Sequence, residues 1–301
     1  MTSEAKRQKL FSLLGDLPVK PDEIMVEKVK EEEKENYILE TLLLGLNSLD
    51  LVPAYFVRPR NVNGKTPVVL FNHSHGGNYH IGKKELIYST DYLQTPSYAE
   101  ELTNMGYSAL CIDMWGFGER RGLTESEIFK EMLWNGQVMW GMMIYDSMRA
   151  IDYLGKRNDI DSSRIATLGM SMGGLMAWWL SSLDERIKVC IDICGQVEAK
   201  TLIEDRGLDY HGLFYYVPGL LKYFQTAEVQ ALIAPRPHLS LVGNYDKLTP
   251  YAGLEKIDRY LSSVYDQQEC DDHWKMSRFG CGHIETESMR KEACLFLQEY
   301  L

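Results

Sequence analysis

The chain has 301 residues, of which 45% are hydrophobic and 25% are charged, a composition typical of a folded globular protein. Its formal net charge of -11 argues against nucleic acid or an anionic membrane as the main partner, because both require a basic footprint. No apolar run is long enough to span a bilayer, and the N-terminal segment lacks the apolar core and cleavage site of a signal peptide. We therefore expect a cytoplasmic protein that binds neither nucleic acid nor a membrane.

The N-terminal quarter of the chain is predicted to contain strands but no recognisable motif. Residues 21–34 are charge-rich and are expected to form an exposed connection or an edge element. The runs YILETLLLGL (37–46) and LVPAYFVRP (51–59) are predicted strands separated by the turn-like NSLD. Pro53 indicates that the second run is an edge strand or that this residue lies at a strand start, because proline cannot donate to the ladder.

Six further apolar runs are predicted strands, and helical patterns lie among them. The runs are PVVLFN (67–72), YSALCID (107–113), RIATLGM (164–170), KVCIDIC (188–194), PHLSLVG (237–243) and the weaker WKMSRFG (274–280). The helical patterns are SYAEELTNMG (97–106), VMWGMMIYDSMRAIDYLGKR (138–157), GLMAWWLSSLD (174–184), YAGLEKIDRYLSSVYD (251–266) and ESMRKEACLFLQEYL (287–301). This alternation predicts an α/β fold with a mostly parallel central sheet flanked by helices. We expect one domain over residues 1–301, with a small cap insertion at about 196–234.

One serine lies in a glycine-rich turn between a predicted strand and a predicted helix. The stretch GMSMG (169–173) is a G-x-S-x-G pattern, with Ser171 at its centre. Glycines on either side of the serine let the strand and helix backbones pass closely, so that the hydroxyl projects above the sheet edge. The alternative is a glycine-rich turn with an incidental serine. We expect Ser171 to be a catalytic nucleophile.

A nucleophilic serine needs a histidine base, which in this arrangement follows the serine in the chain. The downstream candidates outside strands are His211, His273 and His283. His283 lies after the last predicted strand, in the glycine-flanked loop RFGCGHIETE, where its imidazole can turn back over the sheet edge. His273 precedes that strand, and His211 lies in the predicted cap. We therefore expect His283 to be the base.

The orienting acid is expected at the carboxyl end of a strand. Asp246, in LVGNYDKLTP, directly follows a predicted strand and precedes a helix, where catalytic groups of open α/β sheets gather. The alternative for Asp246 is a turn residue or helix cap. Asp192 is the main rival, but it lies within CIDIC, where a carboxylate would be buried unless paired. Glu285 is too close to His283 in sequence to orient it.

An oxyanion hole would complete this set of residues. One donor is expected to be the backbone N–H of Met172, the residue after the nucleophile. The second donor is expected from the loop FNHSHGGN (71–78), and either the His75 or the Gly76 amide is in the right place. A structural role, bonding the loop backbone, is expected for His73.

Cysteine and histidine spacing indicates neither a disulfide framework nor a metal site. None of the six cysteines forms a Cys-x-x-Cys pair, and Cys111, Cys190 and Cys194 lie within apolar strand-like runs. Two sets of residues could be read as metal ligands, namely His73, His75 and His80, or Cys270, His273, Cys281 and His283. Neither spacing matches a standard zinc pattern, so we predict no metal and no cofactor.

The predicted cap is rich in aromatic residues within IEDRGLDYHGLFYYVPGLLKYF (203–224). We expect a substrate pocket formed by its Tyr210, His211, Phe214 and Tyr215, with Trp115 at the same rim. The alternative is that these rings pack the cap against the sheet.

The chain resembles the α/β-hydrolase superfamily, specifically its dienelactone-hydrolase-like and acetyl-xylan-esterase-like branch. The resemblance rests on HSHGG, IDMWGFGER, GMSMGG, ALIAPRPHLSLVGNYDKLTP and GCGHIETESMR, which span most of the chain from about residue 67. It implies an α/β-hydrolase fold with Ser171 as nucleophile, Asp246 as acid and His283 as base. Two departures stand out: Ser74 replaces a common glycine of the oxyanion loop, and dienelactone hydrolases proper use cysteine as nucleophile.

These residues predict a serine hydrolase of small-molecule carboxylic esters, such as a deacetylase of small or sugar esters, acting through an acyl-enzyme intermediate. One alternative is a serine peptidase of the prolyl-oligopeptidase type, although the chain has no propeller-sized extra domain. The other is a non-catalytic binding protein with a hydrolase fold, which an intact Ser, Asp and His set argues against. The sequence does not fix the oligomeric state.

Overall fold

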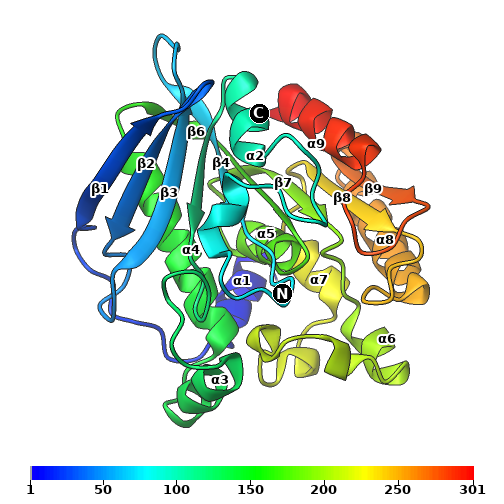
Figure 1. The fold of residues 1–301 in the computed structure, drawn as a ribbon. Helices are drawn as coiled ribbons and strands as arrows, with labels where there is room; N and C mark the ends of the chain where they lie inside the picture. Colours follow the sequence, from blue (N-terminus) through cyan, green and yellow to red (C-terminus); the bar gives the residue numbers. More distant parts are fainter. Residues whose placement is uncertain (1) are drawn as a thin grey trace.

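The computed structural model describes residues 2–301 and shows a nine-stranded sheet with helices on both faces (Figure 1). Its strands are β1 (Val26–Glu33), β2 (Tyr37–Leu44), β3 (Val52–Pro59), β4 (Thr66–Asn72), β5 (Ser108–Ile112), β6 (Ile160–Met170), β7 (Ile187–Ile193), β8 (His238–Gly243) and β9 (Trp274–Phe279). Its α-helices are α1 (Ser3–Phe11), α2 (Tyr98–Asn104), α3 (Glu125–Trp134), α4 (Met139–Lys156), α5 (Met172–Leu183), α6 (Ala199–Glu204), α7 (Thr226–Gln230), α8 (Tyr251–Asp266) and α9 (Glu287–Tyr300). Short 3₁₀ helices are η1 (Gly82–Leu86), η2 (Leu208–Tyr210), η3 (Leu213–Tyr215), η4 (Leu220–Lys222) and η5 (Asp271–His273).

The sheet is mostly parallel, as the sequence predicts. Its strand order is β1-β2-β3-β5-β4-β6-β7-β8-β9, in which the pairs from β5 through β9 are parallel and those from β1 through β3 to β5 are antiparallel. Parallel strands end at a common edge of the sheet. The loops that follow β4, β6, β8 and β9 therefore lie at that edge, where ligands of open α/β sheets bind.

The two edges of the sheet are formed by β1 and β9, and not by the strand that contains Pro53. The side chains of β1 are mostly exposed and rich in glutamate and lysine, which disfavours pairing with another chain. Pro53 is the second residue of β3, which lies between β2 and β5. The edge assignment for Pro53 was therefore wrong, and its place at a strand start is the correct alternative.

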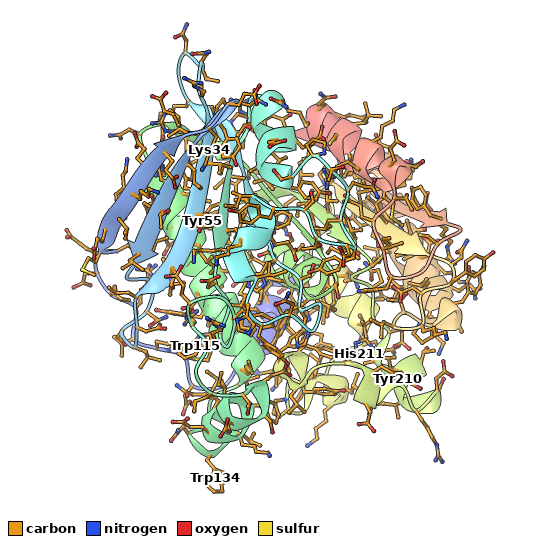
Figure 2. All side chains as sticks on the ribbon, in the orientation of Figure 1. Lys34, Tyr55, Trp115, Trp134, Tyr210 and His211 are labelled. Carbon is orange, nitrogen blue, oxygen red and sulfur yellow. The ribbon has the colours of Figure 1, made fainter. Side chains whose placement is uncertain are left out.

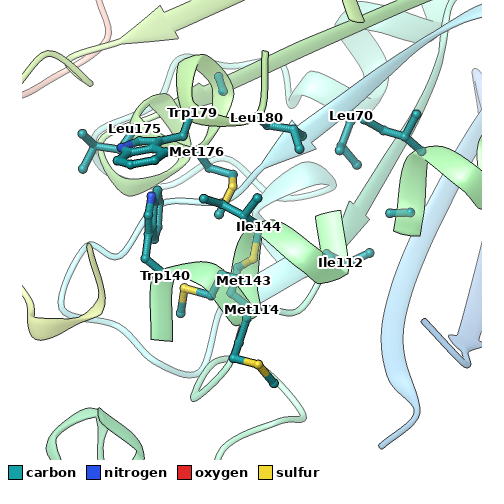
Figure 3. Close-up of a cluster of buried hydrophobic side chains, with 14 of the residues drawn as sticks. Leu70, Ile112, Met114, Trp140, Met143, Ile144, Leu175, Met176, Trp179 and Leu180 are labelled. Carbon is teal, nitrogen blue, oxygen red and sulfur yellow. The ribbon is translucent and has the colours of Figure 1, made fainter. Parts of the chain in front are cut away.

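Both faces of the inner parallel strands are buried, and successive side chains along each strand point to opposite faces. In β4, Val68 and Leu70 join the cluster that includes α4 and α5, whereas Val69 and Phe71 join the cluster that includes α2 and α9. Figure 3 shows the first cluster between α4 and α5 and the sheet. This double burial explains why the strands are continuous apolar runs in the sequence.

The segment predicted as a cap, residues 196–234, lies between β7 and β8. It contains the short elements α6, η2, η3, η4 and α7 and runs along the lower right of Figure 1. We call residues 196–234 the cap segment below. Across residues 2–301, no helix combines the length and apolarity needed to cross a membrane.

The turn from β6 into α5 is packed against β4 through backbone atoms. A Cβ added to Gly173 would overlap the carbonyl oxygen of Asn72, and one added to Gly169 would lie 2.6 Å from the same oxygen. The first turn of α5 can therefore lie directly on the end of β4 only because these positions lack side chains.

We expect Gly173→Ala to lower the free energy of unfolding by about 3 kcal/mol, because the added methyl must push β4 and α5 apart. The matched control is Gly155→Ala, also in a helix, where an added Cβ meets nothing within 4 Å. That variant should keep or slightly raise stability, because alanine is the better helix former. Urea unfolding followed by circular dichroism measures both, and equal stability of the two variants would refute the proposed backbone constraint.

Candidate active site

Ser171 occupies a strained turn between β6 and α5. Its backbone angles are φ 57° and ψ -119°, which is rare for a residue with a side chain. The turn is held from both sides, because the Ser171 amide donates to the Ile193 carbonyl at 2.8 Å and its carbonyl accepts from Leu175 at 2.9 Å. The hydroxyl is thus fixed at the sheet edge, beside the N-terminus of α5.

The structure brings Ser171, His283 and Asp246 together from three separate loops. The His283 ring lies 2.8 Å from the Ser171 hydroxyl through Nε2 and 2.7 Å from the Asp246 carboxylate through Nδ1. Asp246 is buried, and its other oxygen accepts from the Leu248 amide at 2.9 Å. A carboxylate at Nδ1 favours the tautomer that carries its proton there, which leaves Nε2 free to accept the serine proton. The arrangement can therefore make the serine a nucleophile.

The rival residues lie elsewhere. Asp192 is fully buried in β7 and bonds to His238 at 2.8 Å and to Ser240 at 2.9 Å. Glu285 pairs with Arg290 at 2.8 Å. The His273 ring lies 2.6 Å from the Pro235 carbonyl oxygen. The positions of these three residues in the sequence argued against a role beside Ser171. In the structure each of them contacts a partner outside the Ser171, His283 and Asp246 group.

The Asp192–His238 pair is a buried charged pair within the sheet. Burial opposes the charge on His238, but Cys190 and the Asp192 carboxylate outweigh it and raise the pKa of His238 to about 9. Because the folded pKa lies above the usual value of 6.5, the pair stabilises the fold fully below about pH 6.5. The stabilisation is lost as the pH rises through about 9.

We expect Asp192→Asn to lower the free energy of unfolding by about 3 kcal/mol at pH 6, because it leaves a buried cation without its partner. The difference from the wild type should shrink at pH 9.5, where His238 is mostly neutral in the wild type as well. The control is His80→Gln, which changes an exposed histidine and should leave the pH dependence intact. Urea unfolding at both pH values measures this, and a difference that does not change with pH would contradict the charged pair.

The loop after β4 lies beside Ser171 and presents free amides. The Ser74 hydroxyl donates to the Met170 carbonyl at 3.1 Å, and its amide donates to the buried Glu85 carboxylate at 2.9 Å. Ser74 is thereby excluded as an amide donor. Within residues 2–301 the amides of His75, Gly76 and Met172 have no hydrogen-bond acceptor. Those are the amides that the sequence pointed to, and their position allows them to bind a negative oxygen.

Glu125, at the start of α3, links this loop to the cap segment and was missed by sequence reasoning. Its carboxylate lies 2.8 Å from the His75 ring nitrogen Nε2 and accepts from the Tyr79 hydroxyl, also at 2.8 Å. Its other oxygen accepts from the amides of Leu213 and Phe214. Burial opposes its ionisation, but the bonds from His75 and Tyr79 lower the pKa of Glu125. Nothing local in TESE signals this role, because all four partners are distant in sequence.

The residues predicted to form one substrate pocket lie in different places. His211 lines a cavity of about 660 Å³ together with His75, Tyr79 and Arg121. Burial lowers the pKa of His211, and its Nε2 is buried without a partner. His211 is therefore the one of the five that shares a cavity with the oxyanion loop.

The other four predicted pocket residues are not placed in that cavity. Phe214 is buried, stacked on the His75 ring at 5.5 Å, and Tyr215 lines a second cavity behind it. Tyr210 is 71% exposed. Trp115 lies well to one side of Tyr210 and His211 in Figure 2 and packs under the Arg120 guanidinium. The structure thus does not bring these four residues into the cavity of the oxyanion loop, because their rings pack against several different surfaces.

The histidine and cysteine groups considered as metal ligands do not gather around a shared point. The ring of His73 accepts from the Met114 amide at 3.1 Å, as expected for a structural role, while His75 contacts Glu125 and His80 contacts Arg121. Among the described residues, one group has ligand atoms within 4.8 Å of one another, namely Cys194, Asp246 and His283. In that group Asp246 and His283 already bond each other, and burial raises the pKa of the Cys194 thiol, which disfavours the thiolate.

Comparison with known proteins places this geometry in a family. Residues 52–209 match the model of the dienelactone hydrolase family. The chain is 56% identical over 296 residues to YtaP of Bacillus subtilis (strain 168), which is named as a hydrolase, and the match covers 98% of this chain and 99% of that protein.

Solved structures share the fold at low sequence identity. One from Bacteroides fragilis NCTC 9343, titled as an acetyl xylan esterase, matches with a TM-score of 0.73 at 17% identity and covers 98% of this chain and 81% of its own. The glucuronoyl esterase from Solibacter usitatus matches with a TM-score of 0.70 at 15% identity, covering 97% and 91%. The chain belongs to the dienelactone hydrolase family, and it is an enzyme of the carboxylic ester hydrolase class.

Proposed function

We propose that this enzyme is a serine esterase that cleaves carboxylic esters through Ser171, His283 and Asp246. The observation that carries the proposal is the continuous chain of contacts from the Asp246 carboxylate through the His283 ring to the Ser171 hydroxyl, at 2.7 Å and 2.8 Å. A nucleophile, a base and an orienting acid linked in this way are the parts that acyl transfer requires.

The proposed reaction has two steps. Ser171 attacks the ester carbonyl while His283 Nε2 takes the hydroxyl proton, and the same proton then passes to the departing alcohol. Water, deprotonated by His283, next attacks the acyl-serine, and His283 returns that proton to the Ser171 oxygen as the bond to the acyl group breaks and the carboxylic acid leaves. Asp246 keeps the ring oriented and stabilises its cation in both steps. The buried position of Asp246 strengthens this interaction, because the carboxylate is shielded from water.

The negative oxygen formed in each step is proposed to bind the Met172 amide and an amide of the loop after β4. Of the two loop candidates we favour His75, because Ser74 directly before it is bonded to Met170, the residue that precedes the nucleophile. The amides near the α5 N-terminus also lie in the positive field of the helix. No cofactor enters this mechanism.

The cavity that contains His75 and His211 is proposed to receive the alcohol part of the ester. Its lining includes the polar side chains of Tyr79, His80 and Arg121 as well as the unpartnered His211 Nε2. A buried ring nitrogen without a partner is costly unless a ligand or water satisfies it. This lining fits a hydroxyl-rich alcohol, and the fold neighbours named for acetyl xylan and glucuronoyl esters support a small or sugar ester as substrate.

We expect Ser171→Ala to reduce the kcat for p-nitrophenyl acetate by about a million-fold, as loss of the nucleophile of such a unit does. The control is Ser163→Ala, which removes an exposed hydroxyl of β6 and should leave turnover unchanged. A spectrophotometric assay of purified protein, extended to acetylated sugars and a peptide substrate, measures this. Normal turnover in Ser171→Ala would sink the proposed function.

Glu125 is proposed as a positioning residue for the His75 amide. Glu125→Gln keeps the shape but cannot accept at both oxygens, so His75 loosens and kcat should fall about ten-fold with KM little changed. Glu127→Gln is the control, because that exposed side chain only caps its own helix. Steady-state kinetics measures both variants. A loss of thermal stability in Glu125→Gln with kcat intact would show that the contact is only structural.

A further inference from the structure

A second cavity lies beneath the cap segment, apart from the reacting groups. It has a volume of about 530 Å³, within the range of small-molecule sites. Its floor is formed by Leu175, Trp178 and Trp179 of α5, and its walls come from residues 197–226. Figure 3 shows Leu175 and Trp179 next to each other on α5. The cavity opens to the solvent at its rim, and a concave apolar space of this size is typical of small-molecule sites.

The lining of this cavity is apolar, and several of its polar groups are already satisfied. The Trp178 indole nitrogen donates to the Gly195 carbonyl at 2.9 Å, and the Tyr216 hydroxyl donates to the Leu208 carbonyl at 3.0 Å. The Thr226 hydroxyl accepts from the Ala199 amide at 3.2 Å. A ligand would therefore gain mainly from apolar contact, as a hydrocarbon chain does.

The rim of the cavity is exposed and carries a cation. Ile203 is 49% exposed, and Leu221 is 38% exposed, so apolar surface continues from the cavity to the solvent. Lys222 is exposed at the same rim and is the single charged side chain among the described lining residues. An apolar interior with one ammonium group at the mouth is complementary to an amphiphile with an anionic head.

The cavity is separated from the proposed reaction site by the cap segment. Tyr215 lines this cavity, whereas His211 lines the cavity of the oxyanion loop. The centroids of the two rings lie 5.6 Å apart. None of Ser171, Asp246 and His283 lines it. The wall of residues 211–216 between the two cavities leaves room for an occupant other than the ester under attack.

We propose that this cavity, which we call the α5–cap cavity, binds a free medium-chain fatty acid. The hydrocarbon chain lies on Leu175, Trp178 and Trp179, and the carboxylate meets Lys222 at the rim. Tyr215 lines the cavity, its ring packs against the ring of Phe214 behind it, and Phe214 stacks on His75, so the bound chain supports the residues that the oxyanion loop packs against.

The test uses the intact enzyme and laurate as the probe. Bromine quenches tryptophan fluorescence on contact, so a brominated laurate should quench part of the emission saturably through Trp178 and Trp179. Unlabelled laurate should displace it, whereas acetate should not. Absence of saturable quenching would overturn the proposal.

Two variants locate the site. Ile203→Asp places a negative charge at the mouth of the cavity, where it repels the carboxylate of laurate. This variant should bind laurate at least ten-fold more weakly. Lys222→Gln should weaken laurate about three-fold, as expected for an exposed ion pair, and leave dodecanol unchanged. The control is Lys200→Gln, an exposed lysine of α6 outside the lining, which should bind normally. Weakening in the control equal to that in Lys222→Gln would also overturn the proposal.

A third arm separates this site from the proposed reaction site. Ser171→Ala, and the wild type blocked at its serine by phenylmethylsulfonyl fluoride, should both bind laurate with unchanged affinity. Loss of binding on blocking would show that laurate occupies the acyl position of the reacting ester, which refutes a separate site. Since binding is measured without hydrolysis, a failed esterase assay would leave this result standing.

Discussion

The contact between the backbones of β4, β6 and α5 is the constraint on which the candidate active site depends. Asn72 ends β4 against Gly169 and Gly173, where side chains would not fit. Its side chain also donates to Thr167 of β6 at 2.7 Å, which fixes the two strand ends together. With α5 pressed onto this junction, Ser171 must take positive φ, and its hydroxyl points out of the sheet edge. The strain at Ser171 is sustained because the surrounding backbone permits no other path.

The parallel sheet also positions the acid and the base at the edge where Ser171 lies. Asp246 follows β8 and His283 follows β9, so both loops leave the sheet at the edge where Ser171 lies. The loop after β4 arrives at the same edge and is anchored by the buried Glu85, whose pKa burial raises to about 7. Glu125 joins that loop to the cap segment. The reacting side chains and the backbone amides of these loops thereby lie close together at one edge of the sheet. The proposed chemistry uses no metal or cofactor.

The two cavities differ in chemistry because different faces of the cap segment line them. The cavity beside His75 contains polar and charged side chains, and the α5–cap cavity is apolar with a single lysine at its rim. Residues 211–216 form the wall between them. The relative from Bacillus subtilis is 56% identical over 296 residues, so it can be examined for the same two cavities.

The sequence by itself predicted neither α1 nor α3, but it determined most of the strands and the long helices between them, the mostly parallel sheet, and the three residues that meet at the sheet edge. It could do so because apolar runs, G-x-S-x-G and loop positions after strands are local signals of a fold whose topology is fixed. Only the tertiary structure decided that Glu125 binds His75 and that β3 is an internal strand. The tertiary structure also placed the rings of four residues on separate surfaces, namely Trp115, Tyr210, Phe214 and Tyr215. Those outcomes depend on packing between segments that are distant in the sequence. The spacing of residues along one segment does not indicate which distant segment it will pack against.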